Sequence, residues 1–380
     1  MKLAIASGKG GTGKTTVAVN LAALLSARGH LVALADCDVE EPNAHLFLPV
    51  EWKTREHCTL PVPKVNETLC LGATCRRCVD ACRFKALAFM GDAVLDFPDL
   101  CHGCGLCALV CPTGAMTSAT RLVGEVRGGI ARIRPAMGNG IDPAEKDPAR
   151  PGAAPTLRFR DGVLRIGEAM ATPLIKAVKD VPPPVAPVAR KGVAPGPCVF
   201  VIRDCPPGVA CAAINAVHDA DLLLLVAEPS PFGLHDLRLA VGLARHLRLP
   251  HAVVLNRAGM GTGMSPPGAT PAGGDPVRDW AAREGVPLFG VIPFSRAAAE
   301  CGATGSLVHD AAPEVRAAYT RLADALVVMA RDTRRPCRPW EGMGLAGSAG
   351  LAGPARPAGS AEETGEAGSA TGGKERTCGR

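Results

Sequence analysis

Short apolar runs alternate with amphipathic segments along most of the 380-residue chain. The runs predict buried strands, and the segments between them, with apolar positions three or four residues apart, predict helices. Strands are expected at residues 3–6, 31–35, 199–203, 222–227, 252–255 and 287–292, and helices at 15–28, 237–247, 277–284 and 313–330. This order predicts a doubly wound α/β fold with a mostly parallel sheet and helices on both faces.

The middle and the end of the chain depart from this pattern. Two further strands are expected at residues 122–133 and 157–166, with predicted loops at 137–155 and 259–275. We therefore predict four parts. The nucleotide-binding core comprises residues 1–49 and 198–335, and a cysteine-rich insert occupies residues 50–120. A β-rich return segment at 121–197 ends in a proline-rich connector at 182–197, and a tail follows at 336–380. The tail is mostly Gly, Ala, Ser and Glu, so we expect it to be disordered.

Composition narrows the classes of partner. Aromatic residues make up 3% of the chain and its net charge of +6 is scattered, so no nucleic-acid partner is expected. No apolar run reaches membrane-spanning length and no leader precedes the first strand, so we expect a cytoplasmic protein without a membrane anchor. Thiols stay reduced in that compartment, and eight of the sixteen cysteines lie in one short window, which indicates a metal site.

A phosphate-binding loop is predicted directly after the first strand. Residues 8–15 satisfy the pattern G-x-x-x-x-G-K-[ST] between a strand and a helix. Its glycines let backbone N–H groups surround a phosphate, Lys14 would neutralise the β and γ phosphates, and Thr15 would offer its hydroxyl to Mg²⁺. The predicted nucleotide-binding residues of the loop are Gly8, Lys9, Gly10, Gly11, Thr12, Gly13, Lys14, Thr15 and Thr16.

The second lysine of the loop, Lys9, gives it a form that resembles the deviant Walker A motif of the MinD, ParA and Mrp ATPases. Residues 36–43, 204–208 and 254–257 resemble the switch I, switch II and adenine-reading segments of that family. The resemblance implies that Lys9 reaches the nucleotide of the partner in an ATP-dependent homodimer and that Asp38 orients the attacking water. It also implies that Asp204 holds Mg²⁺ through water and that Asn256 binds adenine. From the residues alone, the alternative for Asp38 and Asp204 is a helix-cap or turn residue.

The eight clustered cysteines form two runs with similar spacing. The second run, Cys101-x2-Cys104-x2-Cys107-x3-Cys111-Pro112, has the bacterial ferredoxin spacing for 4Fe–4S clusters. The first, Cys70-x4-Cys75-x2-Cys78-x3-Cys82, has two extra residues. A plant-type 2Fe–2S site is disfavoured because its fourth cysteine would lie far downstream, and zinc remains the main alternative. The resemblance to two-cluster ferredoxins implies crossed ligation: Cys70, Cys75, Cys78 and Cys111 hold one cluster, and Cys82, Cys101, Cys104 and Cys107 hold the other.

Together these motifs resemble MinD-like ATPases with an inserted small α+β ferredoxin-like domain. The resemblance implies ATP, Mg²⁺ and two 4Fe–4S clusters as cofactors, and an ATPase whose dimer switching is linked to electron transfer with a redox partner protein. The alternatives are an Mrp-like ATPase that assembles iron–sulfur or other metallocofactors, and a redox-sensing spatial regulator. Of the cysteines near the switch segments, Cys211 has the offset from Asp204 of a bridging-cluster ligand, but we interpret it as a buried apolar side chain.

Overall fold

The computed structural model describes residues 1–133, 155–184, 196–260 and 275–332. Within them the chain forms one nine-stranded sheet and one two-stranded sheet. Most of the predicted loops at 137–155 and 259–275 and of the predicted connector at 182–197 lies outside the described residues, as does the whole predicted tail at 336–380.

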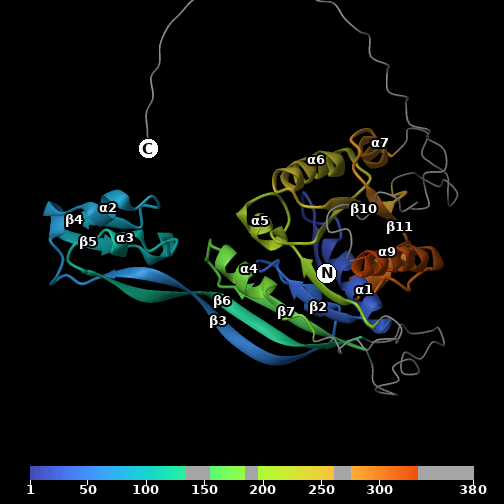
Figure 1. Ribbon diagram of the computed structural model, residues 1–380, viewed down its shortest axis with the longest axis horizontal. Helices are drawn as coiled ribbons and strands as arrows, with labels where there is room; N and C mark the ends of the chain where they lie inside the picture. Colours follow the sequence, from blue (N-terminus) through green and yellow to red (C-terminus); the bar gives the residue numbers. More distant parts are fainter. Residues whose placement is uncertain (134–154, 185–195, 261–274, 333–380) are drawn as a thin grey trace, which may run out of the picture. The chain divides into compact units, whose positions relative to one another are not determined.

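Parallel strands form the body of the large sheet, in the order β11-β10-β9-β1-β8-β2-β7 (Figure 1). They are β1 (Lys2–Ala6), β2 (Leu31–Asp36), β7 (Thr156–Leu164), β8 (Val199–Asp204), β9 (Leu222–Ala227), β10 (His251–Ala258) and β11 (Leu288–Pro293). The central strands are mostly apolar because helices cover both of their faces, and their buried charged residues lie near the carboxyl ends, at Asp36, Arg203 and Asp204. The mostly parallel α/β sheet predicted from the sequence is thus confirmed.

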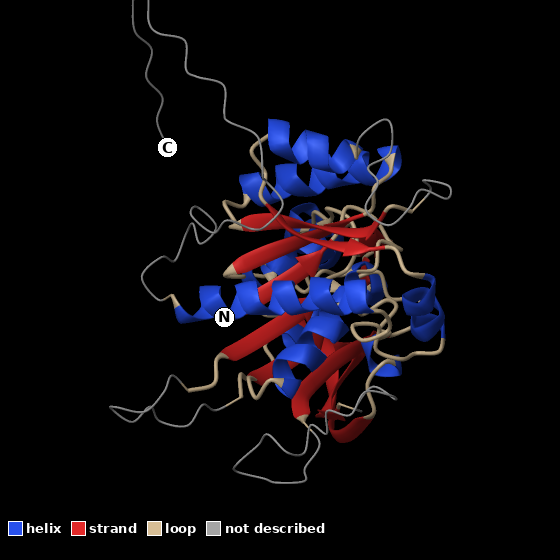
Figure 2. Ribbon diagram, turned by 90° about the vertical axis from the view of Figure 1, so that its right-hand side faces the viewer, coloured by secondary structure: helices blue, strands red, loops and turns tan. Residues whose placement is uncertain are grey.

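Helices cover the two faces of this sheet (Figure 2). On one face lie α1 (Lys14–Ala27) and α9 (Pro313–Arg331). The other face packs against α4 (Thr172–Lys179), α5 (Cys211–Val217), α6 (Pro231–His246) and α7 (Pro276–Arg283) in one apolar core. The remaining helix α8 (Arg296–Ala303) and the short turn η1 (Ala44–Leu46) complete this part of the chain. No helix in the described ranges is both long and apolar enough to cross a bilayer.

A long antiparallel hairpin, β3 (Val50–Val65) and β6 (Met116–Arg132), extends the sheet beyond β7. It appears as a twisted two-stranded ribbon in Figure 1. The predicted boundary between residues 120 and 121 falls inside β6, and β7 pairs with β2, so strands of the predicted return segment belong to the main sheet. The pattern does not predict β3, because Pro61 and Pro63 interrupt it; prolines are tolerated in β3 because it is the edge strand.

The cysteine module, residues 66–115, connects the two strands of this hairpin. Its elements are η2 (Gly72–Thr74), α2 (Arg77–Ala81), β4 (Leu87–Met90), β5 (Ala93–Asp96), η3 (Pro98–Leu100) and α3 (Leu106–Leu109). The two cysteine runs share a local conformation: a left-handed residue, Arg76 (φ 54°) or Gly105 (φ 73°), precedes a short helix that carries the third cysteine of its run. The internal repeat visible in the sequence is therefore also a structural repeat.

Candidate functional site

The predicted phosphate loop lies between β1 and α1, and close packing restricts two of its glycines. A Cβ atom on Gly8 would lie 2.1 Å from the carbonyl oxygen of Asp236, and one on Gly13 would lie 2.4 Å from Nδ2 of Asn256. Gly13 also has a φ of 90° and stands directly before the first residue of α1. Only glycine fits such positions, and the N-terminus of α1 directs its free N–H groups and partial positive charge to this loop.

Buried acidic side chains lie where the strands end beside this loop. Asp36 ends β2 and Asp204 ends β8, and the two residues are paired in register. The Thr15 hydroxyl donates a 2.5 Å hydrogen bond to Oδ2 of Asp204, whereas Oδ1 of Asp204 is buried without a hydrogen-bond partner. Burial raises the pKa of Asp204 to about 7, although Thr15 and Lys14 oppose that rise. An orphaned carboxylate oxygen beside a threonine hydroxyl fits a hard divalent cation such as Mg²⁺.

The predicted switch I segment is organised around Asp36, a residue for which the sequence motifs predict no role. Its carboxylate accepts backbone N–H bonds from Asp38, Asn43 and Ala44, at 3.2, 3.0 and 3.0 Å. These bonds fold the segment so that Asp38 comes near Lys14. Burial raises the pKa of Asp38 to about 6, although the charge of Lys14 opposes that rise. The sequence contains a signal for this role, because Asp36 directly follows the apolar residues of β2. A charged side chain that is fully buried at such a place needs polar partners, and the three backbone N–H groups supply them.

Lys9 and Asn256, both predicted to contact nucleotide, make contacts within this chain. Nζ of Lys9 lies 3.1 Å from Oε1 of Glu228, whose other oxygen lies 3.7 Å from Arg257. Nδ2 of Asn256 donates a 2.8 Å hydrogen bond to the carbonyl oxygen of Thr12, so this side chain holds the phosphate loop. Their predicted roles toward a partner's nucleotide and toward adenine remain predictions.

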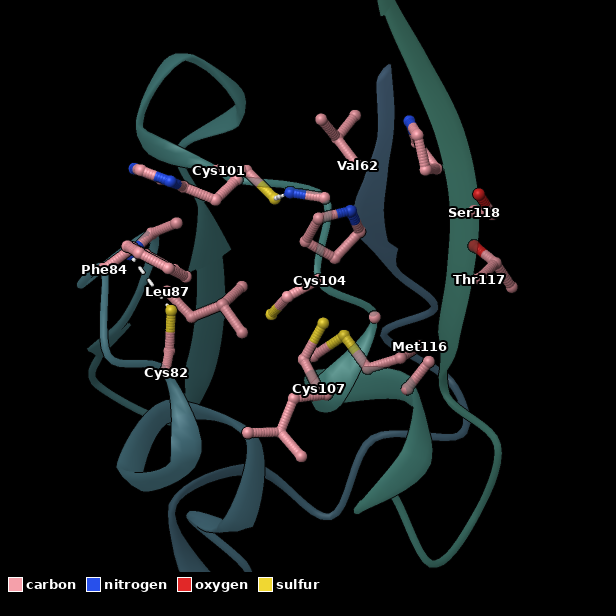
Figure 3. Close-up of a pocket in the computed structure, with 18 residues that line it drawn as sticks. Val62, Cys82, Phe84, Leu87, Cys101, Cys104, Cys107, Met116, Thr117 and Ser118 are labelled. Atoms are coloured by element: carbon pink, nitrogen blue, oxygen red, sulfur yellow. Dashed lines mark hydrogen bonds between the residues drawn. The ribbon is translucent and has the colours of Figure 1, made fainter. Parts of the chain in front are cut away.

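One cavity of the cysteine module is surrounded by cysteines from both runs. It measures about 130 Å³ and its lining includes Cys82, Cys101, Cys104 and Cys107. Figure 3 shows the four sulfur atoms on different sides of this space, together with Leu87 and Met116. The backbone N–H of Ala86 donates to Sγ of Cys82 and that of Gly103 to Sγ of Cys101, each at 3.3 Å. Such bonds stabilise sulfur that carries negative charge.

A second, smaller cavity of about 20 Å³ is surrounded by the other four cysteines. Its lining includes Cys70, Cys75, Cys78 and Cys111, so the last cysteine of the second run stands with three from the first. Cys78 lies close enough to Cys70 and Cys111 that thiolates there would raise its pKa, although burial is the larger cause of the rise. The structure thus brings the eight cysteines together in the crossed sets.

The side chains around these two cavities are of the type that binds soft metal groups, since four thiolates suit either Zn²⁺ or an iron–sulfur cluster. In the described ranges, no three Cys, His, Asp or Glu side chains stand close enough to hold a single metal ion. Four cysteines around a cavity form the ligand set of a 4Fe–4S cluster, so the residues fit this group.

The cysteines outside the module occupy different environments. Cys37 and Cys205 are fully buried, and burial raises the pKa of both thiols, that of Cys205 to about 12. Cys211 is exposed at the start of α5, so its interpretation as a buried apolar side chain was wrong. Helix α5 buries Ala213, Ala216 and Val217 instead, so its first residue lies on the solvent side.

The comparison with protein families agrees with this geometry. Residues 3–308 match the family described as the CobQ/CobB/MinD/ParA nucleotide binding domain. The chain therefore belongs to this family of nucleotide-binding proteins, and the resemblance of its core to MinD and ParA is confirmed.

Individual proteins similar to this chain lie in the same group. An uncharacterized protein of Methanocaldococcus jannaschii is 30% identical over 261 residues, which are 68% of this chain and 79% of that protein. An iron–sulfur cluster carrier protein of Pyrococcus abyssi is 52% identical over 50 residues, 13% of this chain and 17% of the carrier. The septum site-determining protein MinD of Pyrococcus horikoshii, solved with Mg-ADP, is 18% identical with a TM-score of 0.44, covering 86% of this chain and 95% of that one.

Proposed function

We propose that this protein is an ATP-hydrolysing iron–sulfur protein in which nucleotide-driven switching of a homodimer is coupled to electron transfer through two 4Fe–4S clusters. The observation that carries the proposal is the pair of cavities in one chain, each lined by four cysteines in the crossed arrangement. This arrangement occurs in a chain of the CobQ/CobB/MinD/ParA family, whose phosphate loop and acidic strand ends are intact.

The nucleotide half of the proposal assigns roles to residues of this chain. The phosphate loop and Lys14 bind the β and γ phosphates, while Thr15 and Asp204 would hold Mg²⁺. Asp38 lies near Lys14 and orients the attacking water, and Asn256 keeps the loop in its binding conformation. Lys9 would leave Glu228 and reach the nucleotide of the partner subunit, which makes hydrolysis depend on the dimer.

The cluster half rests on the donor set. Cys82, Cys101, Cys104 and Cys107 would hold one cluster, and Cys70, Cys75, Cys78 and Cys111 the other. When bound, such clusters supply one-electron redox chemistry at potentials set by nearby charge and hydrogen bonds. Four thiolates per cluster favour retention over donation, so we place electron transfer to a partner protein ahead of the cargo function. The short match to cluster carriers keeps metallocofactor assembly as the second candidate.

The test of this proposal is the metal content of the anaerobically purified protein. We expect about eight iron and about eight acid-labile sulfide per chain, because two 4Fe–4S clusters contain that many. Reduction should produce EPR signals of two interacting clusters. Incubation with an apo-ferredoxin separates the two candidates, since an electron carrier keeps its iron and a cluster carrier loses it. Stoichiometric zinc without sulfide would overturn both.

A further inference from the structure

A buried ion pair lies beside one of the two cysteine cavities. Arg121 on β6 and Glu168, in the loop between β7 and α4, are each 7% exposed, and Nη1 of Arg121 lies 3.3 Å from Oε2 of Glu168. The two residues are 47 positions apart, so no local pattern in the sequence pairs them. Charges that are almost fully removed from solvent act over longer distances than exposed ones, because water screens them less.

The guanidinium of this pair is bonded directly to a cysteine peptide of the larger cavity. Nη2 of Arg121 donates to the carbonyl oxygen of Cys101 at 3.2 Å, and Nη1 donates to the carbonyl oxygen of Asp99 at 3.0 Å. The fixed positive charge of Arg121 would therefore stabilise the reduced, more negative form of a redox group bound in this cavity. The carboxylate of Glu168 opposes this effect, and no hydrogen bond among the described residues joins it to a cysteine of this cavity.

Among the described residues that line the smaller cavity, no charged side chain is buried as deeply as Arg121. The arginines that line it are Arg76 and Arg77, and both are exposed, so solvent screens their charge. Around Arg121, the other charged groups are Asp99 and Arg165, whose side chains are 80% and 39% exposed. The buried pair therefore distinguishes the two cavities electrostatically.

Strand β7, which leads into the loop that carries Glu168, also contacts the predicted switch I segment. The backbone N–H of Leu164, at the end of β7, donates a 3.0 Å hydrogen bond to the carbonyl oxygen of Val39, the residue after Asp38. Oε1 of Glu168 accepts the N–H of Met170 at 2.9 Å, which fixes the carboxylate to the same loop. A shift of switch I can thus move this carboxylate relative to Arg121.

We propose that Arg121 and Glu168 are positioning residues that set the reduction potential of the cluster held by Cys82, Cys101, Cys104 and Cys107, and make it higher than that of the other cluster. The inference rests on the proposed function, because it requires both clusters. It gives the electron path a direction, from the cavity without a buried cation to the cavity beside Arg121.

The experiment is a potentiometric EPR titration of the full-length protein and its variants. The buried cation favours the reduced cluster, so Arg121→Gln should lower the equilibrium constant for reduction of one cluster about tenfold. This corresponds to a fall of about 59 mV in its midpoint potential for one electron. Glu168→Gln leaves the cation unopposed and should raise the same midpoint potential. The double variant should lie between Arg121→Gln and the parent, because the proposed net effect of the pair is to raise this potential. Repeating the titrations in a Cys75→Ala background, which retains the cluster near Cys101, identifies the cluster that shifts.

Arg165→Gln is the matched control, since it removes the same charge from an exposed position in the same network. It should shift the midpoint much less than Arg121→Gln. Opposite shifts in the two single variants support the inference, because general damage to the fold cannot raise the potential in one and lower it in the other. If Arg121→Gln loses its cluster, two other variants test the inference. Glu168→Gln should still raise the midpoint potential, and Arg121→Lys, which keeps the positive charge, should have a midpoint potential close to that of the parent. Unshifted midpoints with full iron content overturn the inference alone, whereas a parent protein without iron and sulfide overturns the proposed function with it.

Discussion

Replacement of Cys111 by alanine is expected to lower the iron content from about eight to about four atoms per chain, with the loss confined to the cluster of the first cysteine run. Cys111 belongs to the second run by position, but it lines the cavity of Cys70, Cys75 and Cys78. Removal of one of four thiolates leaves iron with an open position and a cluster that is easily lost. The residual cluster should be the one near Cys101.

Pairs of substitutions distinguish this arrangement from ligation run by run. Cys75→Ala with Cys111→Ala removes two ligands of one cavity, so about four iron atoms should remain. Cys104→Ala with Cys111→Ala removes one ligand from each cavity, so almost no iron should remain. Ligation run by run predicts the reverse for the two pairs. Cys301→Ala, outside the cysteine module, is the control and should retain the full content.

Lys14→Ala is expected to weaken ATP binding by at least about a hundredfold, or about 2.7 kcal/mol. Lys14 is only 6% exposed and stands near both Asp38 and Asp204. Its loss removes the counter-charge of the phosphates and leaves the two carboxylates to repel them. Isothermal titration calorimetry measures the affinity, and circular dichroism establishes that the variant is folded.

Lys9→Ala is the matched control from the same loop. Its side chain is 39% exposed and pairs with Glu228, so we expect ATP binding close to that of the parent. Hydrolysis and ATP-dependent dimerisation should be lost, because this lysine is proposed to act on the nucleotide of the partner subunit. Parental hydrolysis by Lys9→Ala would contradict the proposed dimeric site, and parental affinity in Lys14→Ala would contradict the nucleotide site itself.

The parallel core was predictable because its strands are apolar on both faces and separated by helical segments. The phosphate loop was predictable for a local reason, since its glycines and lysines are consecutive. The crossed cysteine sets followed from spacing together with the resemblance to two-cluster ferredoxins. In each case the deciding residues lie close together in the chain or repeat at a fixed interval.

Long-range features were not predictable in this way. Strand β3 is polar and contains two prolines, and only its place at the sheet edge explains why it forms. The role of Asp36 depends on a loop that folds back over it, and the pairing of Arg121 with Glu168 depends on how β6 and β7 align. These contacts arise from tertiary structure, for which a single sequence contains no periodic signal.

We propose that nucleotide state and cluster potential are coupled. Two connections join the hairpin to the predicted ATP site. Strand β3 follows the predicted switch I segment along the chain, and β6 pairs with β7, whose Leu164 donates its backbone N–H to the carbonyl oxygen of Val39. We therefore expect a ligand that moves this segment to alter the environment of Arg121 and Glu168. By linkage, the redox state of the cluster would then alter nucleotide affinity by the same free energy.

The most direct measurement is a potentiometric titration of the protein without nucleotide, with ADP and with a non-hydrolysable ATP analogue. We expect the ATP analogue, compared with ADP, to shift the midpoint potential of at least one cluster by tens of millivolts, where about 59 mV is a tenfold change for one electron. Asp38→Asn should reduce this shift. Three superimposable curves, with nucleotide shown to be bound in each case, would contradict the coupling and leave the ATPase and the clusters as independent parts of one chain.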